Sequence, residues 1–125
     1  MGLQVKATEK KAGFFEVAVS GRLDTTTYGQ LEGQLKVTLP SANAIVLDMG
    51  LLEYISSMGL RVIFKATKDM KAKGGVFMMS NMQPQIKKVF EIANALEQDS
   101  VFLTVEEADR YFQAMQDKVK REQGQ

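Results

Sequence analysis

Residues 44–80 read AIVLDMGLLEYISSMGLRVIFKATKDMKAKGGVFMMS, and this stretch decides the fold. It opens with a continuous apolar run at 44–47 and closes with a second one at 76–79. Short runs without alternation are typical of strands that are covered on both faces in a parallel sheet. Between them an apolar stripe recurs at helical spacing, namely Leu60, Ile63, Phe64 and Thr67. The stretch therefore predicts a strand–helix–strand unit, with a brief connection over 51–56 and a helix that begins near Ser57.

Upstream of this unit, two alternating runs flank the glycine-containing turn Lys11-Ala12-Gly13, at 3–8 and 15–19. Alternation on both sides of such a turn predicts a β-hairpin. The period then changes, because Tyr28, Leu31, Leu35 and Leu39 share one helical stripe that Pro40 ends. Residues 24–27 supply several possible N-caps for this helix, of which Asp24 is the simplest choice.

Downstream, Pro84 begins a third helical pattern, residues 100–103 form a short apolar run, and Thr104 opens a capping box for a last helix. The predicted order is strand, strand, helix, strand, helix, strand, helix, strand, helix. This order indicates an α/β fold with a mixed, largely parallel sheet and about four helices. We expect one domain over residues 1–119 and a frayed polar tail over 120–125.

Composition excludes several classes of function. The chain of 125 residues contains no histidine and no cysteine, so the usual general base, thiolate nucleophiles and the commonest metal ligands are missing. The formal net charge is +1, with basic and acidic residues intermixed, which gives no electrostatic footprint for nucleic acid or a membrane surface. We expect no metal and no cofactor. Because the first residues alternate like a strand and lack an apolar signal segment, we expect a cytoplasmic location.

Polar residues follow three predicted strands, at Asp24, at Asp48 and at Ser80. Partners of open α/β sheets bind at such strand ends. Ser57 lies between a strand and a helix, where we expect an exposed hydroxyl beside helical N–H groups that favour negative charge. A phosphate there would add about −1.5 to −2 charges and spoil a docking surface without refolding the chain. Alternatively, Ser57 serves as an N-cap, a role that is compatible with the first.

Three segments resemble the STAS domain of bacterial anti-sigma factor antagonists: Gly21-Arg22-Leu23-Asp24, Val46-Leu47-Asp48 with the 54–62 stretch, and Gly74-Gly75. The resemblance implies a protein that binds a serine-kinase anti-sigma factor with a histidine-kinase-like ATPase fold. Phosphorylation by that kinase ends the binding, and a serine phosphatase restores it. Aligning the glycine of the family motif on Gly59 places the phosphoacceptor at Ser57, with Ser56 as the second candidate. We expect the protein to be a monomer.

The same resemblance implies a set of partner-binding residues: Asp24, Thr25, Asp48, Ser56, Ser57, Met58, Gly59 and Arg61. The sequence departs from the family pattern at three of them. Ser56 stands where many members have Asp, Met58 where they have Ser or Thr, and Arg61 where they often have Gly. Arg61 follows Ser57 by one helical turn, so it either pairs with an added phosphate or remains a solvated surface cation.

The alternatives to this function are a module of the same fold without the switch, a receiver domain and an enzyme. The same fold without the switch would be a STAS scaffold or a nucleotide-binding regulatory module. A receiver phosphorylated on Asp48 would need an acidic cluster and a later lysine, neither of which the strand ends provide. Catalysis is not expected, because the chain has no histidine, no phosphate-binding glycine loop and no nucleophile elbow.

Overall fold

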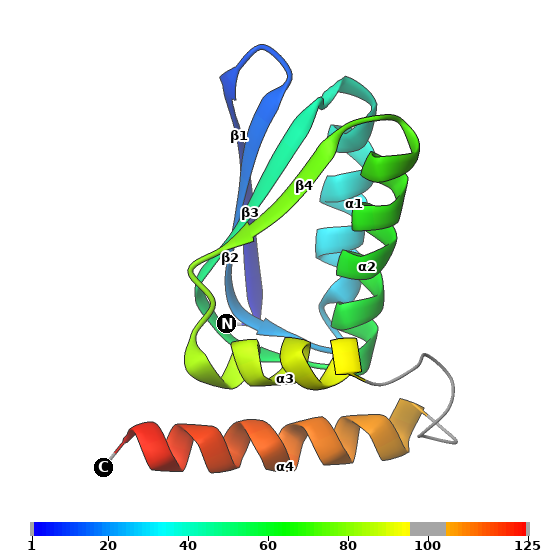
Figure 1. The fold of residues 1–125 in the computed structure, drawn as a ribbon. Coiled ribbons are helices and arrows are strands. Elements are labelled where there is room, and N and C mark those ends of the chain that lie inside the picture. The colour runs from blue at the N-terminus through cyan, green and yellow to red at the C-terminus, as the bar shows by residue number, and fades with distance from the viewer. Residues whose placement is uncertain (1, 96–104, 125) are drawn as a thin grey trace.

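A mixed sheet covered on one face by two helices forms the body of the protein (Figure 1). The computed structural model describes residues 2–95 and 105–124. In chain order, the elements within these residues are β1 (Leu3–Lys11), β2 (Phe14–Leu23), α1 (Tyr28–Thr38), a 3-10 turn η1 (Leu39–Ser41), β3 (Ala44–Ile55), α2 (Ser57–Ala72), β4 (Val76–Ser80), α3 (Pro84–Ala95) and α4 (Val105–Gln123).

The strands of the described residues lie in the order β1-β2-β3-β4. β1 and β2 pair antiparallel, whereas β3 pairs parallel with both β2 and β4. The predicted hairpin and the predicted strand–helix–strand crossover are therefore confirmed. A parallel pair cannot be joined by a tight turn, so α1 and α2 must carry the chain back across the sheet.

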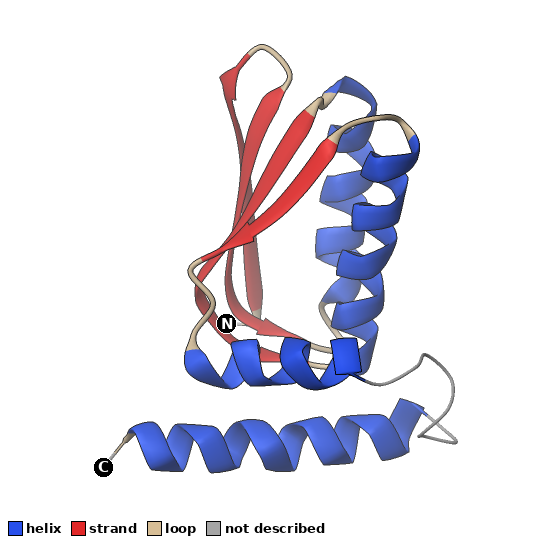
Figure 2. Cartoon of the chain, in the orientation of Figure 1, coloured by secondary structure: helices blue, strands red, loops and turns tan. Residues whose placement is uncertain are grey.

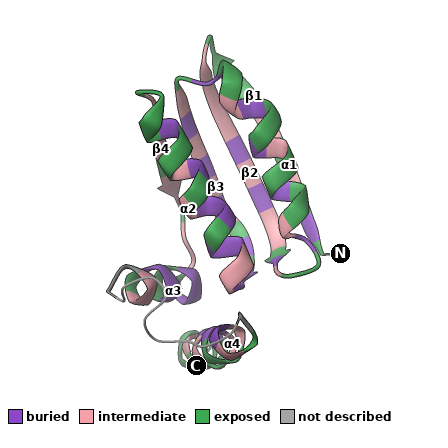
Figure 3. Ribbon diagram, turned by 90° about the vertical axis from the view of Figure 1, so that its right-hand side faces the viewer, coloured by how far each residue is buried: buried purple, intermediate pink, exposed green. Residues whose placement is uncertain are grey.

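Buried side chains lie between the sheet and the two crossover helices. Figure 3 shows the ribbon of buried residues along β2 and β3, behind α1 and α2. Fully covered members of this core include Val17, Ile45, Leu47, Leu31 and Ile63. The opposite face of the sheet carries no helix in the described part of the chain (Figure 2). The strands therefore have one apolar and one partly exposed face, and the expectation that both faces of β3 and β4 are covered is wrong.

β3 is longer than the sequence predicts. It continues past Asp48 to Ile55, through residues that we expect to form a connection. The continuation is possible because register shifts between Ala18 and Ser20, and between Gly21 and Arg22, keep the end of β2 paired with β3. Asp48 consequently lies inside a strand and not at the end of one.

The C-terminal helices lie across the lower end of the sheet, with α4 below α3 (Figures 1 and 3). The last helix continues to Gln123, so the predicted tail is helical through that residue. Lys120 and Arg121 in its last turn complement the negative end of the helix dipole, and Gly124 N–H donates to the Lys120 carbonyl. The predicted strand at 100–103 and the capping residue Thr104 lie outside the described residues.

Candidate functional site

The junction between β3 and α2 brings the predicted phosphoacceptor to the lower end of the sheet. Ile55 ends β3 in full burial, and the Ser56 N–H donates to the Leu23 carbonyl at 2.9 Å, which ties the junction to the end of β2. α2 then begins at Ser57. The predicted start of this helix is therefore confirmed.

Ser56, and not Ser57, is the N-cap of α2. Its Oγ accepts from the Gly59 N–H at 3.3 Å, and its carbonyl accepts from the Leu60 N–H at 3.0 Å. The side chain is needed because the first N–H groups of a helix have no partner within the helix. Ser56 is 1% exposed, so its hydroxyl is both engaged and covered.

Ser57 is the first residue of α2, and its hydroxyl is covered. The Oγ is buried and has no hydrogen-bond partner among the described residues. Its backbone N–H donates to Asp109 Oδ1 of α4 at 2.7 Å. The expectation of an exposed hydroxyl is therefore wrong in this conformation, although the residue as a whole is half-buried.

A second side chain of α4 fastens the helix to the end of β3. Gln116 Oε1 accepts from the Ile55 N–H at 3.0 Å, and its Nε2 donates to the Ile55 carbonyl at 2.8 Å. Gln116 is 1% exposed, and Phe112 on the same helix is also buried. The amide thus satisfies both backbone groups of a buried residue, as a further strand would.

Asp24 organises the turn that follows β2, and it does not cap α1. Its carboxylate accepts from the Thr26 N–H at 2.9 Å and from the Thr26 hydroxyl at 2.7 Å. The N-cap of α1 is Thr27, which is within the predicted range 24–27, but the choice of Asp24 as the cap is wrong. Burial would raise the pKa of Asp24, but hydrogen bonds from Thr26 and Thr27 and the charge of Arg22 together lower the pKa below its usual value. Thr25 in the same turn is exposed.

Arg22 and Tyr54 form a contact between this turn and the junction. The Arg22 guanidinium lies 4.1 Å from the centroid of the Tyr54 ring, and its Nε is 3.6 Å from Asp24 Oδ2. Burial, with the charge of Asp109 as the second cause, raises the pKa of Tyr54 above its usual value. The raised pKa of Tyr54 therefore has two main causes, which are the burial of the phenol and the negative charge of Asp109 on α4.

The remaining residues of the motif differ in exposure. Gly59 is buried, Met58 is half-buried and Arg61 is exposed. A Cβ on Gly59 would lie 2.7 Å from Leu23 Cγ and 3.0 Å from Ile55 Cγ1. Glycine is thus needed for the first turn of α2 to approach the ends of β2 and β3.

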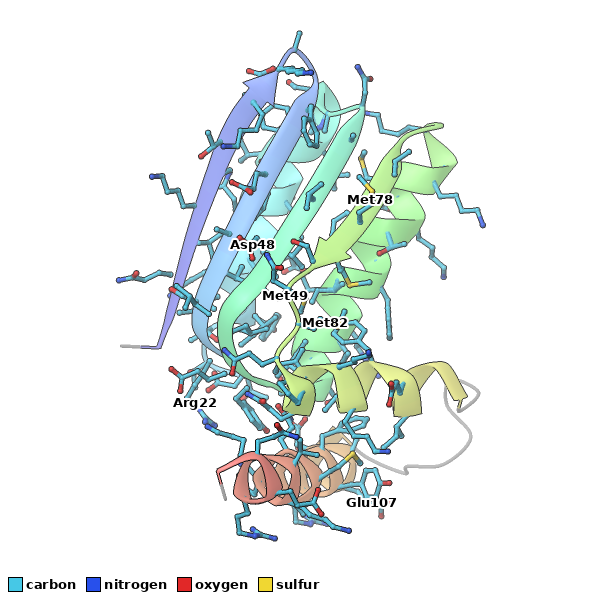
Figure 4. The ribbon with its side chains drawn as sticks, turned by 60° about the vertical axis from the view of Figure 1, so that its left-hand side comes forward. Arg22, Asp48, Met49, Met78, Met82 and Glu107 are labelled. Carbon is cyan, nitrogen blue, oxygen red and sulfur yellow. The ribbon has the colours of Figure 1, made fainter. Side chains whose placement is uncertain are left out.

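Asp48 lies apart from this junction. Its Oδ1 accepts from the Gly50 N–H at 3.0 Å and from Asn81 Nδ2 at 3.2 Å, which links β3 to the residue after β4. Ile55 follows Asp48 by seven residues along β3, which corresponds to roughly 20 Å at the usual rise of a strand. Figure 4 shows Asp48 midway along the sheet and Arg22 near its lower end. The structure does not bring Asp48 to Ser57.

The family model of the STAS domain matches residues 6–108, which is most of the chain and includes the whole junction. The chain belongs to the STAS domain family. BtrV of Bordetella bronchiseptica, named as an anti-sigma factor antagonist, is 32% identical to this STAS domain over 89 residues, which are 70% of this chain and 77% of BtrV. By homology the chain falls within the anti-sigma factor antagonist family.

Solved structures show that the fold is shared. Unphosphorylated SpoIIAA, an anti-sigma factor antagonist, superimposes with a TM-score of 0.67 at 16% identity, covering 73% of this chain and 81% of SpoIIAA. Phosphorylated SpoIIAA, described as a Bacillus cell fate determinant, gives a TM-score of 0.63 at 16% identity, covering 72% and 83%. An anti-sigma factor antagonist from Mycobacterium paratuberculosis gives 0.67 at 20% identity, covering 90% and 95%.

The contacts that hold α4 at the junction come from residues that the sequence analysis did not select. Asp109 and Gln116 both lie beyond residue 108, where the match to the STAS family model ends. One signal was available: Gln116 is a polar residue within the apolar helical stripe of Ala108, Phe112, Met115 and Val119. A polar side chain on the inward face of a helix needs a buried partner, and Ile55 provides it.

The described residues contain neither a candidate membrane span nor a candidate metal site. No helix within 2–95 and 105–124 has both the length and the apolar character required to cross a bilayer. The same residues contain no group of three acidic, histidine or cysteine side chains arranged to hold a metal ion.

Proposed function

We propose that this STAS domain is an anti-sigma factor antagonist that binds a serine-kinase anti-sigma factor and is switched off by phosphorylation at Ser57. The observation that supports the proposal is the carboxylate of Asp109 on the Ser57 N–H, at 2.7 Å. An N–H group at the start of α2 already holds an anionic oxygen, and a phosphate on the adjacent hydroxyl would require the same kind of partner.

The proposed modification is a phosphoryl transfer from ATP. The Ser57 Oγ forms a bond to the γ-phosphorus, and the bond from that phosphorus to the bridging β,γ oxygen breaks. ADP leaves, and a base on the kinase takes the hydroxyl proton. A serine phosphatase reverses the modification by hydrolysis. Because ATP is a cytosolic co-substrate, we place this cycle in the cytoplasm.

The surface that the kinase recognises would surround the junction. Thr25 and Arg61 are exposed, Asp24 and Met58 are half-buried, and all four belong to the segments next to Ser57. Adding about −1.5 to −2 charges among them would replace a shape-matched contact by a hydrated one. The protein thus acts as a binding partner and a kinase substrate, and the kinase supplies the catalysis. A docking surface that also includes Asp48 would have to extend from the junction along β3.

The test is phosphorylation by a candidate serine-kinase anti-sigma factor with ATP, followed by peptide mapping. We expect phosphate on Ser57, its loss in Ser57→Ala and its retention in Ser56→Asn, which preserves a good N-cap. Ser57→Asp should weaken binding to the kinase, whereas the matched variant Ser41→Asp, at an exposed residue of η1, should not. Phosphate on any other residue, or equal binding by Ser57→Asp, would refute the proposal.

A second candidate function has one observation in its favour. The Ser57 Oγ is buried without a partner among the described residues, as in a STAS scaffold that is never phosphorylated. Such a scaffold would bind its partner with the same affinity in the wild type and in Ser57→Ala, and no kinase would label it. Stable partner binding without any phosphate incorporation would favour this alternative.

A further inference from the structure

We propose that α4 is a displaceable cover of Ser57, so that docking of α4 and phosphorylation of Ser57 exclude each other. This inference concerns the regulation of the proposed phosphorylation site and rests on that function for its biological meaning. Its geometric basis is three hydrogen bonds between α4 and the junction. One involves the Ser57 N–H, and the other two involve the N–H and the carbonyl of Ile55.

The covered hydroxyl cannot serve as a phosphoacceptor. Phosphoryl transfer requires the attacking oxygen to approach the phosphorus to about 3–3.5 Å, in line with the leaving oxygen. The Ser57 Oγ is instead sealed from solvent. A kinase must therefore meet a conformation in which α4 has moved away, form the bond from Oγ to the γ-phosphorus and release ADP.

Charge makes the exclusion reciprocal. Asp109 binds the N–H of the residue that would carry the phosphate. The phosphate and the Asp109 carboxylate would then compete for the Ser57 N–H in a partly buried site. Repulsion between these two anions favours separation of α2 and α4. The charges of Asp109, Asp24 and Asp117 all act on the Tyr54 phenol, so the neighbourhood is already acidic, and Arg22 is the cation that faces it. Phosphorylation should release α4, and a docked α4 should slow phosphorylation by the same coupling.

The cover is fastened by contacts that a single substitution can remove. Gln116→Leu keeps the approximate size of the side chain and its helix propensity, but it leaves both backbone groups of Ile55 without a partner when α4 is docked. Gln113→Leu is the matched control, because Gln113 bonds only to Asp117 of the same helix, among the bonds found in the described residues. The first variant should open the cover, and the second should not.

The decisive experiment does not need a kinase. Phosphoserine is incorporated at position 57 of the full chain by genetic code expansion, and spin labels are placed through Lys68→Cys on α2 and Lys118→Cys on α4. Both lysines are exposed, and the chain contains no other cysteine. We expect a longer and broader label distance than in the unmodified chain, and at least tenfold faster hydrogen exchange at the Ile55 amide. An unchanged distance with a protected Ile55 amide overturns the inference.

Kinase rates separate this inference from the proposed function. Gln116→Leu should be phosphorylated at Ser57 about tenfold faster than the wild type or Gln113→Leu, since two buried backbone groups have lost their partner. Equal phosphorylation rates in all three proteins would overturn the inference that α4 covers Ser57. Release of α4 by phosphoserine, with no kinase labelling even in Gln116→Leu, supports the cover and refutes the proposed function.

Discussion

Replacement of Gly59 by alanine tests whether the first turn of α2 must lie in contact with the strand ends. The added Cβ would lie 2.7 Å from Leu23 Cγ, 2.9 Å from Leu23 Cδ2 and 3.0 Å from Ile55 Cγ1. Leu23 and Ile55 are each 0% exposed, so neither side chain can swing into solvent. The clash must instead be relieved by moving α2 or by adopting poor rotamers.

Two opposing effects set the size of the change. Overpacking of this kind costs about 1–3 kcal/mol, whereas replacing a helical glycine by alanine gains up to about 1 kcal/mol. The clash involves fully buried atoms, and Gly59 lies in the first turn, where the propensity gain is small. We therefore expect a net loss of about 1–2 kcal/mol in the free energy of unfolding.

The measurement is urea unfolding of Gly59→Ala beside Gly33→Ala. A Cβ on Gly33, inside α1, would meet nothing within 4 Å. That control should gain about 0.5–1 kcal/mol. With a urea dependence of about 1–3 kcal/mol per molar, the loss in Gly59→Ala should lower its midpoint by roughly 0.3–2 M. A Gly59→Ala protein as stable as the wild type would refute the tight approach.

Three further predictions concern the same junction. Ser56→Ala should lose about 1 kcal/mol of stability, because the Gly59 N–H loses its capping partner, and Ser56→Asn should recover most of it in the same urea titration. Because the pKa of Asp24 is lowered in the folded state, its contribution to stability is present above the unfolded value, near pH 4, and is lost as the pH falls through the folded value. Asp24→Asn should therefore show a smaller loss of stability between pH 6 and pH 3 than the wild type, and an identical loss would contradict this role. Because the pKa of Tyr54 is raised, its contribution is present below about pH 10 and is lost as the pH rises through the folded value. Ultraviolet titration should show one tyrosinate, absent in Tyr54→Phe, that forms above the usual tyrosine pKa of about 10 and moves to lower pH in Asp109→Asn.

The alternation of apolar and polar residues was enough to predict the hairpin, the crossover and the start of α2. Those patterns are local, since burial of one face imposes a period of two on strands and of 3.6 on helices. The end of β3 was predicted wrongly for the same reason. Gly50 and Glu53 interrupt the apolar run, and only the shifted pairing with β2 shows that the strand continues.

In the candidate site, too, some features follow from local sequence and others from contacts between distant segments. The placement of Ser57 at the start of a helix follows from residues 44–80. This stretch contains the buried strand, the capping residue Ser56 and Gly59, at which α2 approaches the strand ends. The contacts of this junction with α4 come from Asp109 and Gln116, which are distant in sequence. Local periodicity carries no information about which surface a last helix will cover. Sequence alone thus determined the kind of element that carries Ser57, whereas tertiary packing decided whether that serine is accessible, because solvent access depends on contacts between segments far apart in the chain.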